Sequence, residues 1–243
     1  MRYQGGKVKI SKKIAPLLGG GGTLVSLFCG ACAIEALAAE NFDEVICNDI
    51  QPYIISMFKG LQRGMKLPDN VSEEQWRYTK EHKDENPALT GFIGFACSFG
   101  GRFFEGYARG NGRNYAMDGK KSLEKVMPNL QKVKFICGDY HDVELPDGCV
   151  VYADPPYNGT KKFQNKEFDT FEFWRYMRQI SKDHLVFISE LHAPDDFVCV
   201  WEKEVTRTID RNKDNQPKST EKLFVHKCQL DNFKARTGGV NVL

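Results

Sequence analysis

The chain has 243 residues, of which 41% are hydrophobic and 27% charged, with a formal net charge of +2 at pH 7. These values are ordinary for a globular protein of one domain, or one domain with an insertion. They exclude a low-complexity chain, and the lack of a long apolar run or signal peptide predicts a cytoplasmic protein without a transmembrane helix.

The first twenty residues are basic and contain no acidic side chain. Residues 3–7 form a predicted loop. Apolar residues then recur at helical spacing over 9–18, which predicts a basic amphipathic helix. The glycine run 19–22 ends it and leads into the sheet. The basic face indicates either a solvated helix or a surface for an acidic partner.

Residues 23–49 have the pattern that opens a nucleotide-binding unit. A buried strand is expected over 23–28, a glycine turn over 29–32, a helix over 33–41 and a second strand over 42–49. Glycine lets the backbone approach a ligand, and the following helix offers free N–H groups. Asp49 ends the second strand about 20 residues after the turn, where an acid accepts both ribose hydroxyls.

The eight cysteines are scattered, often within apolar runs, and are interpreted as reduced, buried thiols. Cys29 and Cys32 also fit a redox or zinc motif. The sequence has no second cysteine pair at metal spacing, and the position of these two residues suits a cofactor turn better.

The alternation of strands and helices stops between residues 65 and 130. A polar helix is expected over 72–83, and glycines and aromatic residues follow over 91–104. Arg102, Arg109 and Arg113 then add positive charge. Glycines are expected to give the segment from Gly91 to Arg113 backbone freedom, and its aromatic residues and arginines suit stacking on bases and contact with a nucleic-acid backbone. An ordinary packing insertion with a basic rim is the alternative.

The stretch around which the chain is organised is Asp154-Pro155-Pro156-Tyr157. It follows an apolar strand predicted over 149–153, and two prolines prevent the strand from continuing. The result is a stiff turn that presents a carboxylate and an aromatic ring. In open α/β sheets, ligands bind at this carboxyl end of the strands.

Further strands and helices surround this turn. A strand over 132–137 leads into Gly138-Asp139-Tyr140, and a polar loop with Lys161 and Lys162 follows the turn. The remaining predicted elements are a helix over 170–182 and strands over 184–189, 198–206 and 221–228. We expect the last two strands to pair as a hairpin.

Four motifs in this order resemble the DNA adenine-N6 methyltransferases of the Dam type, the D12-like enzymes with the class alpha motif order. The matching segments are Tyr3 to Lys7, Phe28 to Cys32, Asn48-Asp49 and Asp154 to Tyr157. Cys32 stands where the family usually has a second glycine, and a small thiol is expected to fit there.

The resemblance implies S-adenosylmethionine as methyl donor and a Rossmann-like α/β sheet with a C-terminal antiparallel hairpin. Asp154 to Tyr157 would be the catalytic residues, with Tyr157 stacking on a flipped adenine. No metal is expected. Residues implied to contact the cofactor are Tyr3, Lys7, Phe28, Gly30, Asp49, Asp139, Tyr140 and Asp154.

The same resemblance implies duplex DNA as partner, in a bacterial or phage-infected cell. Arg102, Arg109, Arg113, Lys161 and Lys162 are the candidate DNA contacts. We expect the catalytic domain to comprise residues 1–59 and 131–243, with an inserted target-recognition region over 60–130. Rival interpretations are methylation of cytosine N4 or of a protein amide, and an inactive DNA-binding module of the same fold.

Overall fold

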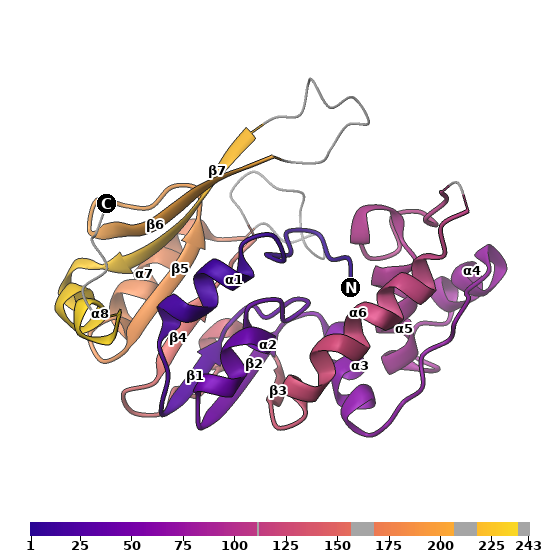
Figure 1. The fold of residues 1–243 in the computed structure, drawn as a ribbon, viewed down its shortest axis with the longest axis horizontal. Coiled ribbons are helices and arrows are strands. Elements are labelled where there is room, and N and C mark those ends of the chain that lie inside the picture. Colours follow the sequence, from indigo (N-terminus) through magenta and orange to yellow (C-terminus); the bar gives the residue numbers. More distant parts are fainter. Residues whose placement is uncertain (111, 157–167, 207–217, 238–243) are drawn as a thin grey trace.

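A computed structural model describes residues 1–110, 112–156, 168–206 and 218–237. Within these residues, seven strands form one sheet in the order β3-β2-β1-β4-β5-β7-β6. The strands from β3 to β5 are parallel, and β7 runs antiparallel to both β5 and β6. The predicted Rossmann-like sheet with a C-terminal hairpin is therefore confirmed (Figure 1).

The elements follow the expected order. The strands are β1 (Thr23–Ser26), β2 (Glu44–Asp49), β3 (Lys134–Cys137), β4 (Val150–Ala153), β5 (Leu185–Glu190), β6 (Phe197–Thr206) and β7 (Lys218–His226). The α-helices are α1 (Ser11–Ile14), α2 (Glu35–Ala38), α3 (Pro52–Gln62), α4 (Glu73–Glu81), α5 (Pro87–Ala96), α6 (Tyr115–Leu130), α7 (Thr170–Ile180) and α8 (Leu230–Thr237). Short 3-10 helices include η1 (Ala15–Leu18), η2 (Ala39–Asn41), η3 (Phe99–Gly101) and η4 (Tyr140–Asp142).

Each face of the sheet has its own hydrophobic core. Along β4, Val150 and Tyr152 pack into the core beneath α1, α2, α3, α6 and α8, whereas Val151 and Ala153 pack into the core beneath α7. This alternation follows from the two-residue period of a strand. Because both faces are covered, the edge formed by the carboxyl ends of the strands is the part of the sheet left for a ligand.

The basic N-terminal helix is shorter than predicted. Regular α-helix covers only Ser11–Ile14, and a 3-10 helix continues it to Leu18. Pro16 explains the change because it has no backbone N–H and crowds the preceding turn. The apolar face of this N-terminal helix is buried as expected, with Ile10, Ile14 and Leu18 in the core.

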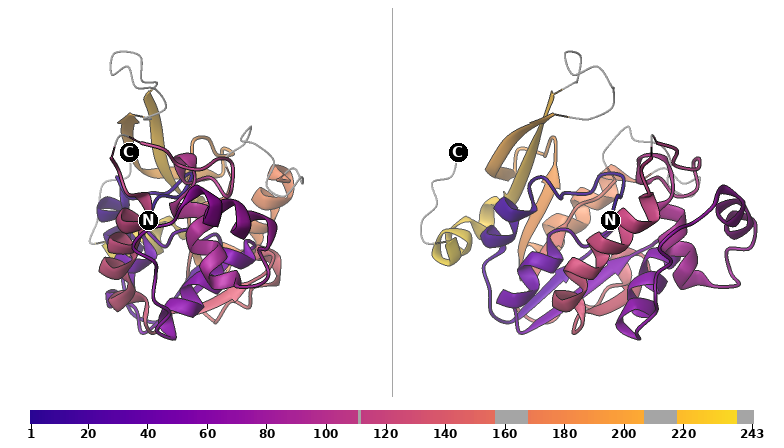
Figure 2. Two further views of the ribbon diagram at one scale, coloured as in Figure 1. Left: turned by 90° about the vertical axis from the view of Figure 1, so that its right-hand side faces the viewer. Right: turned by 45° about the vertical axis from the view of Figure 1, so that its right-hand side comes forward.

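Helices α3 to α6 lie at one end of the molecule, opposite the β6–β7 ribbon (Figure 2). Two of these helices, α5 and α6, were not predicted. The N-terminal segment reaches this helical group, since Gln4 N donates to Gly101 O at 3.2 Å. Arg2 also lies over the Tyr115 ring, with its guanidinium carbon 4.3 Å from the ring centre.

The prediction that glycines give backbone freedom to residues 91–104 is wrong for the first half of that stretch. Gly91 and Gly94 lie inside α5, buried among core side chains. A Cβ on Gly91 would stand 2.0 Å from Tyr53 O, and one on Gly94 would stand 2.4 Å from the Phe103 ring. These glycines therefore allow close packing of α5 against α3 and the following loop.

The cysteines are all free thiols, but not all are buried. Cys137 and Cys228 are exposed, which corrects the interpretation of every cysteine as an interior residue. Cys29 and Cys32 are buried, and their thiols form hydrogen-bonding contacts with each other and with Cys47. No helix among the described residues is long and apolar enough to cross a membrane.

Candidate active site

The predicted catalytic and cofactor residues meet where strand order reverses in the sheet. Strand β1 pairs with β2 on one side and β4 on the other, in register from Leu24 onward. Gly30, Asp49 and Asp154 follow or end these three strands. Their carboxyl ends form the crevice in which open α/β sheets bind ligands.

Asp49 ties the glycine turn to the end of β2. Its Oδ2 atom accepts a hydrogen bond from Gly30 N at 2.8 Å, and its Oδ1 atom accepts one from Gln51 N at 2.9 Å. Burial raises the pKa of the Asp49 carboxyl, and these two backbone N–H groups oppose that shift. Each oxygen has a second lone pair, so the carboxylate can still accept hydroxyl donors.

The ring of Tyr3 packs directly against the glycine turn at Gly30. Gly30 has φ +46°, and a Cβ there would lie 2.8 Å from Cε1 of the Tyr3 ring. The other side of Tyr3 packs against Phe95, with 4.9 Å between ring centres. The structure therefore brings the N-terminal motif and the glycine turn together, as their predicted shared role requires.

The backbone conformation of Cys32 explains why a glycine is usual at this place in the family. Cys32 has φ +52°, in the left-handed region that side chains with a Cβ disfavour. The expectation from the sequence was based on the small size of the Cys32 thiol alone. The thiol does fit, with no exposed surface, and the cost of cysteine here lies in the backbone.

Phe28 and Tyr140 form part of an aromatic cluster beside the turn. Their ring centres are 5.0 Å apart, and Phe168 and Phe173 each lie 6.0 Å from Phe28. Tyr140 is buried, which raises its pKa well above the usual value. Phe28 remains half-buried, so of the two predicted cofactor contacts it has more surface to offer a ligand.

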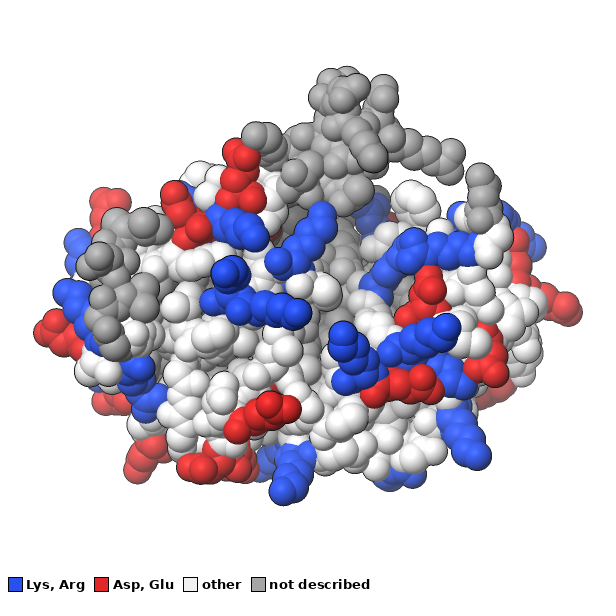
Figure 3. All heavy atoms as spheres, viewed as in Figure 1, with Lys and Arg blue, Asp and Glu red and all other residues white. Residues whose placement is uncertain are grey.

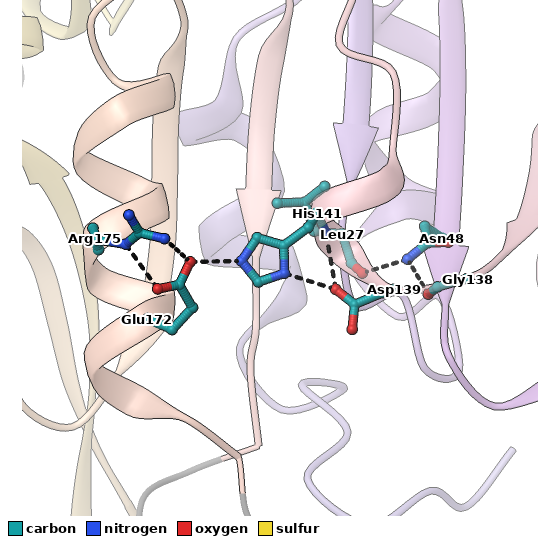
Figure 4. Close-up of polar contacts among 7 residues, drawn as sticks. All are labelled: Leu27, Asn48, Gly138, Asp139, His141, Glu172 and Arg175. Atoms are coloured by element: carbon teal, nitrogen blue, oxygen red, sulfur yellow. Dashed lines mark hydrogen bonds and ion pairs between the residues drawn. The ribbon is translucent and has the colours of Figure 1, made fainter.

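Asp139 caps the short helix η4 (Figure 4). Its Oδ1 atom accepts hydrogen bonds from His141 N at 3.0 Å and from His141 Nδ1 at 2.8 Å. The other ring nitrogen of His141 lies 3.4 Å from Glu172. Asp139 therefore has a structural role at the start of η4, and its contact with the cofactor stays a prediction.

Asn48 is a site residue whose importance was not recognised from the sequence. Its amide nitrogen donates to Leu27 O and Gly138 O, both at 3.1 Å, and so joins the ends of β1 and β3 (Figure 4). The Asn48 Oδ1 atom is the one buried side-chain polar atom without a hydrogen-bond partner among the described residues. An orphaned buried acceptor is costly unless a ligand or water donates to it.

Asp154 lies just beyond β4 and forms an ion pair with Lys7, which also lies near Glu221. Lys7 Nζ lies 2.7 Å from Asp154 Oδ1 and 3.6 Å from Glu221 Oε2 on β7. Burial raises the pKa of Asp154 to about 6, and Lys7 opposes this shift while Glu221 adds to it. Lys7 was predicted to hold the cofactor, and its contact with Asp154 was not foreseen.

Three predicted site residues, Tyr157, Lys161 and Lys162, lie outside the described residues. Their roles stay predictions. Pro155 is buried and Pro156 half-buried at the end of β4, so the described part of the turn has the stiff, packed character that two prolines predict.

The residues at this edge suit S-adenosylmethionine in their chemistry. Its ribose hydroxyls and adenine amine are hydrogen-bond donors, and the edge offers the Asp49 carboxylate and the orphaned Asn48 Oδ1 as acceptors. Because Gly30 has no side chain, the backbone of the turn can lie close to the Tyr3 ring. Ile50 adds an apolar surface that is 46% exposed directly after Asp49.

The three arginines predicted to contact DNA are all paired with acids. Arg109 Nη2 lies 2.6 Å from Glu73 on α4, and Arg113 Nε lies 2.5 Å from Asp118 on α6. Arg102 has a longer contact of 3.3 Å with Glu105 in its own turn. Arg109 thus joins its loop to the distant helix α4, whereas Arg102 and Arg113 pair with acids only three and five residues further along the chain.

Basic side chains gather on both sides of a hollow on the face crossed by the N-terminal segment (Figure 3). Lys9, Lys12 and Lys13 are exposed in and beside α1. In the helical group, Phe99 is 67% exposed beside Gly100 and Gly101, both with positive φ.

The family model for D12 class N6 adenine-specific DNA methyltransferases matches residues 3–99 and 103–221. The chain belongs to this family. The match covers all four sequence motifs and both halves of the sheet, and so confirms the predicted resemblance. S-adenosylmethionine is the methyl donor of such enzymes, as the motifs implied.

The chain is 25% identical over 185 residues to the retron Ec67 DNA adenine methylase of Escherichia coli. The matched stretch is 66% of this chain and 64% of the relative, so the chain spans less than two thirds of that protein.

Solved methyltransferase structures resemble the fold more distantly. The tRNA (m1A58) methyltransferase TrmI of Aquifex aeolicus is 13% identical, covers 90% of this chain and 68% of its own, and gives a TM-score of 0.36. The precorrin-6y C5,15-methyltransferase of Geobacter metallireducens is 8% identical. The match covers 90% of this chain and 89% of that protein, with a TM-score of 0.41.

Proposed function

We propose that this protein transfers a methyl group from S-adenosylmethionine to the N6 amine of adenine in duplex DNA. The observation that carries the proposal is the Asp154 carboxylate, held by Lys7 at 2.7 Å at the strand edge that also presents Gly30 and Asp49. The cofactor supplies an electrophilic methyl group when bound. The remaining chemistry depends on residues of the chain.

Asp154 and the Pro155 carbonyl are the proposed acceptors for the two N–H bonds of the target amine. The lone pair of this amine is delocalised into the ring, so the amine is a poor nucleophile until it is oriented. Acceptors at both N–H bonds direct the lone pair toward the methyl group and stabilise the positive charge that develops on N6. Pro155 has no N–H that would compete.

The target adenine must leave the duplex to reach Asp154. Extrusion costs a few kcal/mol, which stacking on Tyr157 and contacts to phosphates would offset. We assign the phosphate contacts to the exposed lysines of α1, to Lys161 and Lys162, and to the helical segment within 60–130. Arg102 and Phe99 are neighbours on an exposed turn of that segment, which supports a role in target recognition.

Labelled methyl donor offered to DNA and to protein in parallel tests the proposal. Label should enter DNA, and digestion to nucleosides should recover it as N6-methyladenine. Recovery as N4-methylcytosine or in protein would support the rival methyltransferases, and DNA binding without transfer would support the inactive module. Asp154→Asn keeps the side-chain shape, so loss of transfer in this variant, with Asp147→Asn unaffected, would localise the activity to this site.

A further inference from the structure

The ammonium group of Lys7 lies between two carboxylates from distant parts of the sequence. Asp154 Oδ1 is 2.7 Å away and Glu221 Oε2 is 3.6 Å away. The side chains are largely buried, with exposed fractions of 7% for Lys7, 18% for Asp154 and 14% for Glu221. The backbone of Lys7 is anchored as well, because its carbonyl accepts hydrogen bonds from Ile10 N and Ser11 N.

This arrangement conflicts with the acceptor role of Asp154. Lys7 occupies one acceptor position of the Asp154 Oδ1 atom and competes with the target amine for the charge of this carboxylate. A fixed ammonium beside an amine that gains positive charge would also oppose methyl transfer. For the reaction to proceed, the positive charge of Lys7 must shift away from Asp154 without leaving the buried site unpaired.

We propose that Glu221 is a positioning residue that takes over the Lys7 ammonium when the target amine binds to Asp154. This inference rests on the proposed methyltransferase function. The movement required is small, because Glu221 is already within ion-pair distance of Lys7. In the exchange, Asp154 pairs with the amine and Glu221 with Lys7, so each buried carboxylate keeps a positively charged or polarised partner.

Other titratable groups also face Asp154. Glu35 on α2 is buried and its Oε1 atom accepts a hydrogen bond from Ser26 Oγ at 2.6 Å, and burial raises the pKa of Glu35 to about 8. Glu35 is therefore mainly neutral at pH 7. Tyr3 and Tyr152 have pKa values raised by burial and by Asp154, and both stay neutral. Lys7 and Glu221 are thus the charged neighbours that set the ionisation of Asp154.

Glu221→Gln tests the proposal because it removes the charge and keeps the shape. Lys7 then stays on Asp154, so kcat should fall roughly tenfold with the KM values for DNA and cofactor unchanged. Loss of the Glu221 charge lowers the pKa of Asp154 in the free enzyme, so the acidic limb of the kcat/KM profile should move to lower pH. Glu221→Asp, which keeps the charge, should recover part of kcat and the original limb.

Glu202→Gln is the matched control. Glu202 lies on the neighbouring strand β6, is 48% exposed, and lies 3.9 Å from Lys222. It should behave as wild type. If Glu221→Gln matches this control, or loses kcat without a shift of the acidic limb, the positioning role is wrong. A merely structural role for Glu221 would reduce stability or kcat but leave the limb in place.

Titration of the Asp154 carboxyl by NMR in the free protein gives a readout that needs no turnover. Its midpoint should be lower in Glu221→Gln than in Glu202→Gln, and an identical midpoint would overturn the inference. A wild-type protein that does not methylate adenine would refute the proposed function instead. The two failures are therefore distinguished by the wild-type assay and the titration.

Discussion

The strand edge and the helical segment α3–α6 differ in how their sequences relate to their structures. At the edge, three of the four motifs lie at the ends of β1, β2 and β4, so their order along the chain translates directly into position around the crevice. In the helical segment, residues of the same types serve a different purpose. Gly91 and Gly94 allow close helix packing, and Arg109 forms an ion pair with Glu73 on α4.

This difference shows that a residue type predicts a role only where the backbone geometry is fixed by the fold. A glycine after β1 must form a turn, whereas a glycine between aromatic residues can lie in a loop or in a buried helix. The two regions therefore call for different experiments. Substitutions at the edge should reduce chemistry or cofactor binding, and those in the segment should change stability or DNA recognition.

Asp154→Ala should have the largest effect. Removing an acceptor that acts on the developing charge should lower kcat by at least about a hundredfold. Affinity for the cofactor should be retained, since Asp154 is assigned to the target amine. Asp147→Ala, in the exposed loop before β4, is the control. Retention of substantial turnover by the Asp154 variant would contradict the role of Asp154 as acceptor for the target amine.

Asp49→Ala should weaken cofactor binding roughly ten- to a hundredfold, corresponding to about 1.5–3 kcal/mol for the loss of a charged hydrogen-bond partner. Calorimetry measures this directly. Asp43→Ala is a matched control, because Asp43 also accepts a backbone hydrogen bond, from Gly22 N at 2.8 Å, but precedes β2. Equal affinities in the two variants would remove Asp49 from the ribose site.

The pH dependence of the wild-type kcat/KM should show an acidic limb near pH 6. Burial raises the pKa of Asp154 to about 6, and the carboxyl must be ionised to accept the amine. As pH falls below this pKa, the protonated form dominates in the free enzyme and kcat/KM should decrease by roughly tenfold per pH unit. A kcat/KM value that is constant from pH 8 to about pH 5 would contradict a role for ionised Asp154.

Gly91→Ala sharpens the comparison through stability. Its Cβ would stand 2.0 Å from Tyr53 O, so α5 would have to move away from α3. Overpacking of this kind costs about 1–3 kcal/mol of unfolding free energy, measurable by urea denaturation. Gly138→Ala is the control, because its Cβ would stand 4.0 Å from Asn48 Oδ1, at ordinary contact distance. Similar stability of the two variants would restore the flexible-loop interpretation of residue 91.

Arg102→Ala should have the smallest and most local effect. If Arg102 reads a base, binding should weaken by about 1–3 kcal/mol at one position and specificity should relax there. Arg109→Ala should instead weaken binding to all sequences alike and reduce the salt slope by about one unit. Binding of each variant to cognate and singly altered duplexes across a salt series tests both. If both variants match wild type, DNA recognition lies elsewhere in the chain.

Much of the sheet could be predicted because buried strands have distinctive apolar runs and the motifs mark their ends. The contact of Lys7 with Asp154 and Glu221 could not, since it joins residues separated by more than a hundred positions. Helix α5 was missed because two glycines in an apolar run also fit a loop. The left-handed backbone of Cys32 likewise has no signal in a single sequence beyond its departure from the glycine usual in the family.

The most direct measurement is the detection of modified bases in DNA from cells that express either the wild-type protein or Asp154→Ala. We predict N6-methyladenine at a recurring sequence in DNA from cells with the wild-type protein, and its absence with the variant. Unmodified adenine in both samples, or modified cytosine in its place, would contradict the assignment of Asp154 to the methylation of adenine.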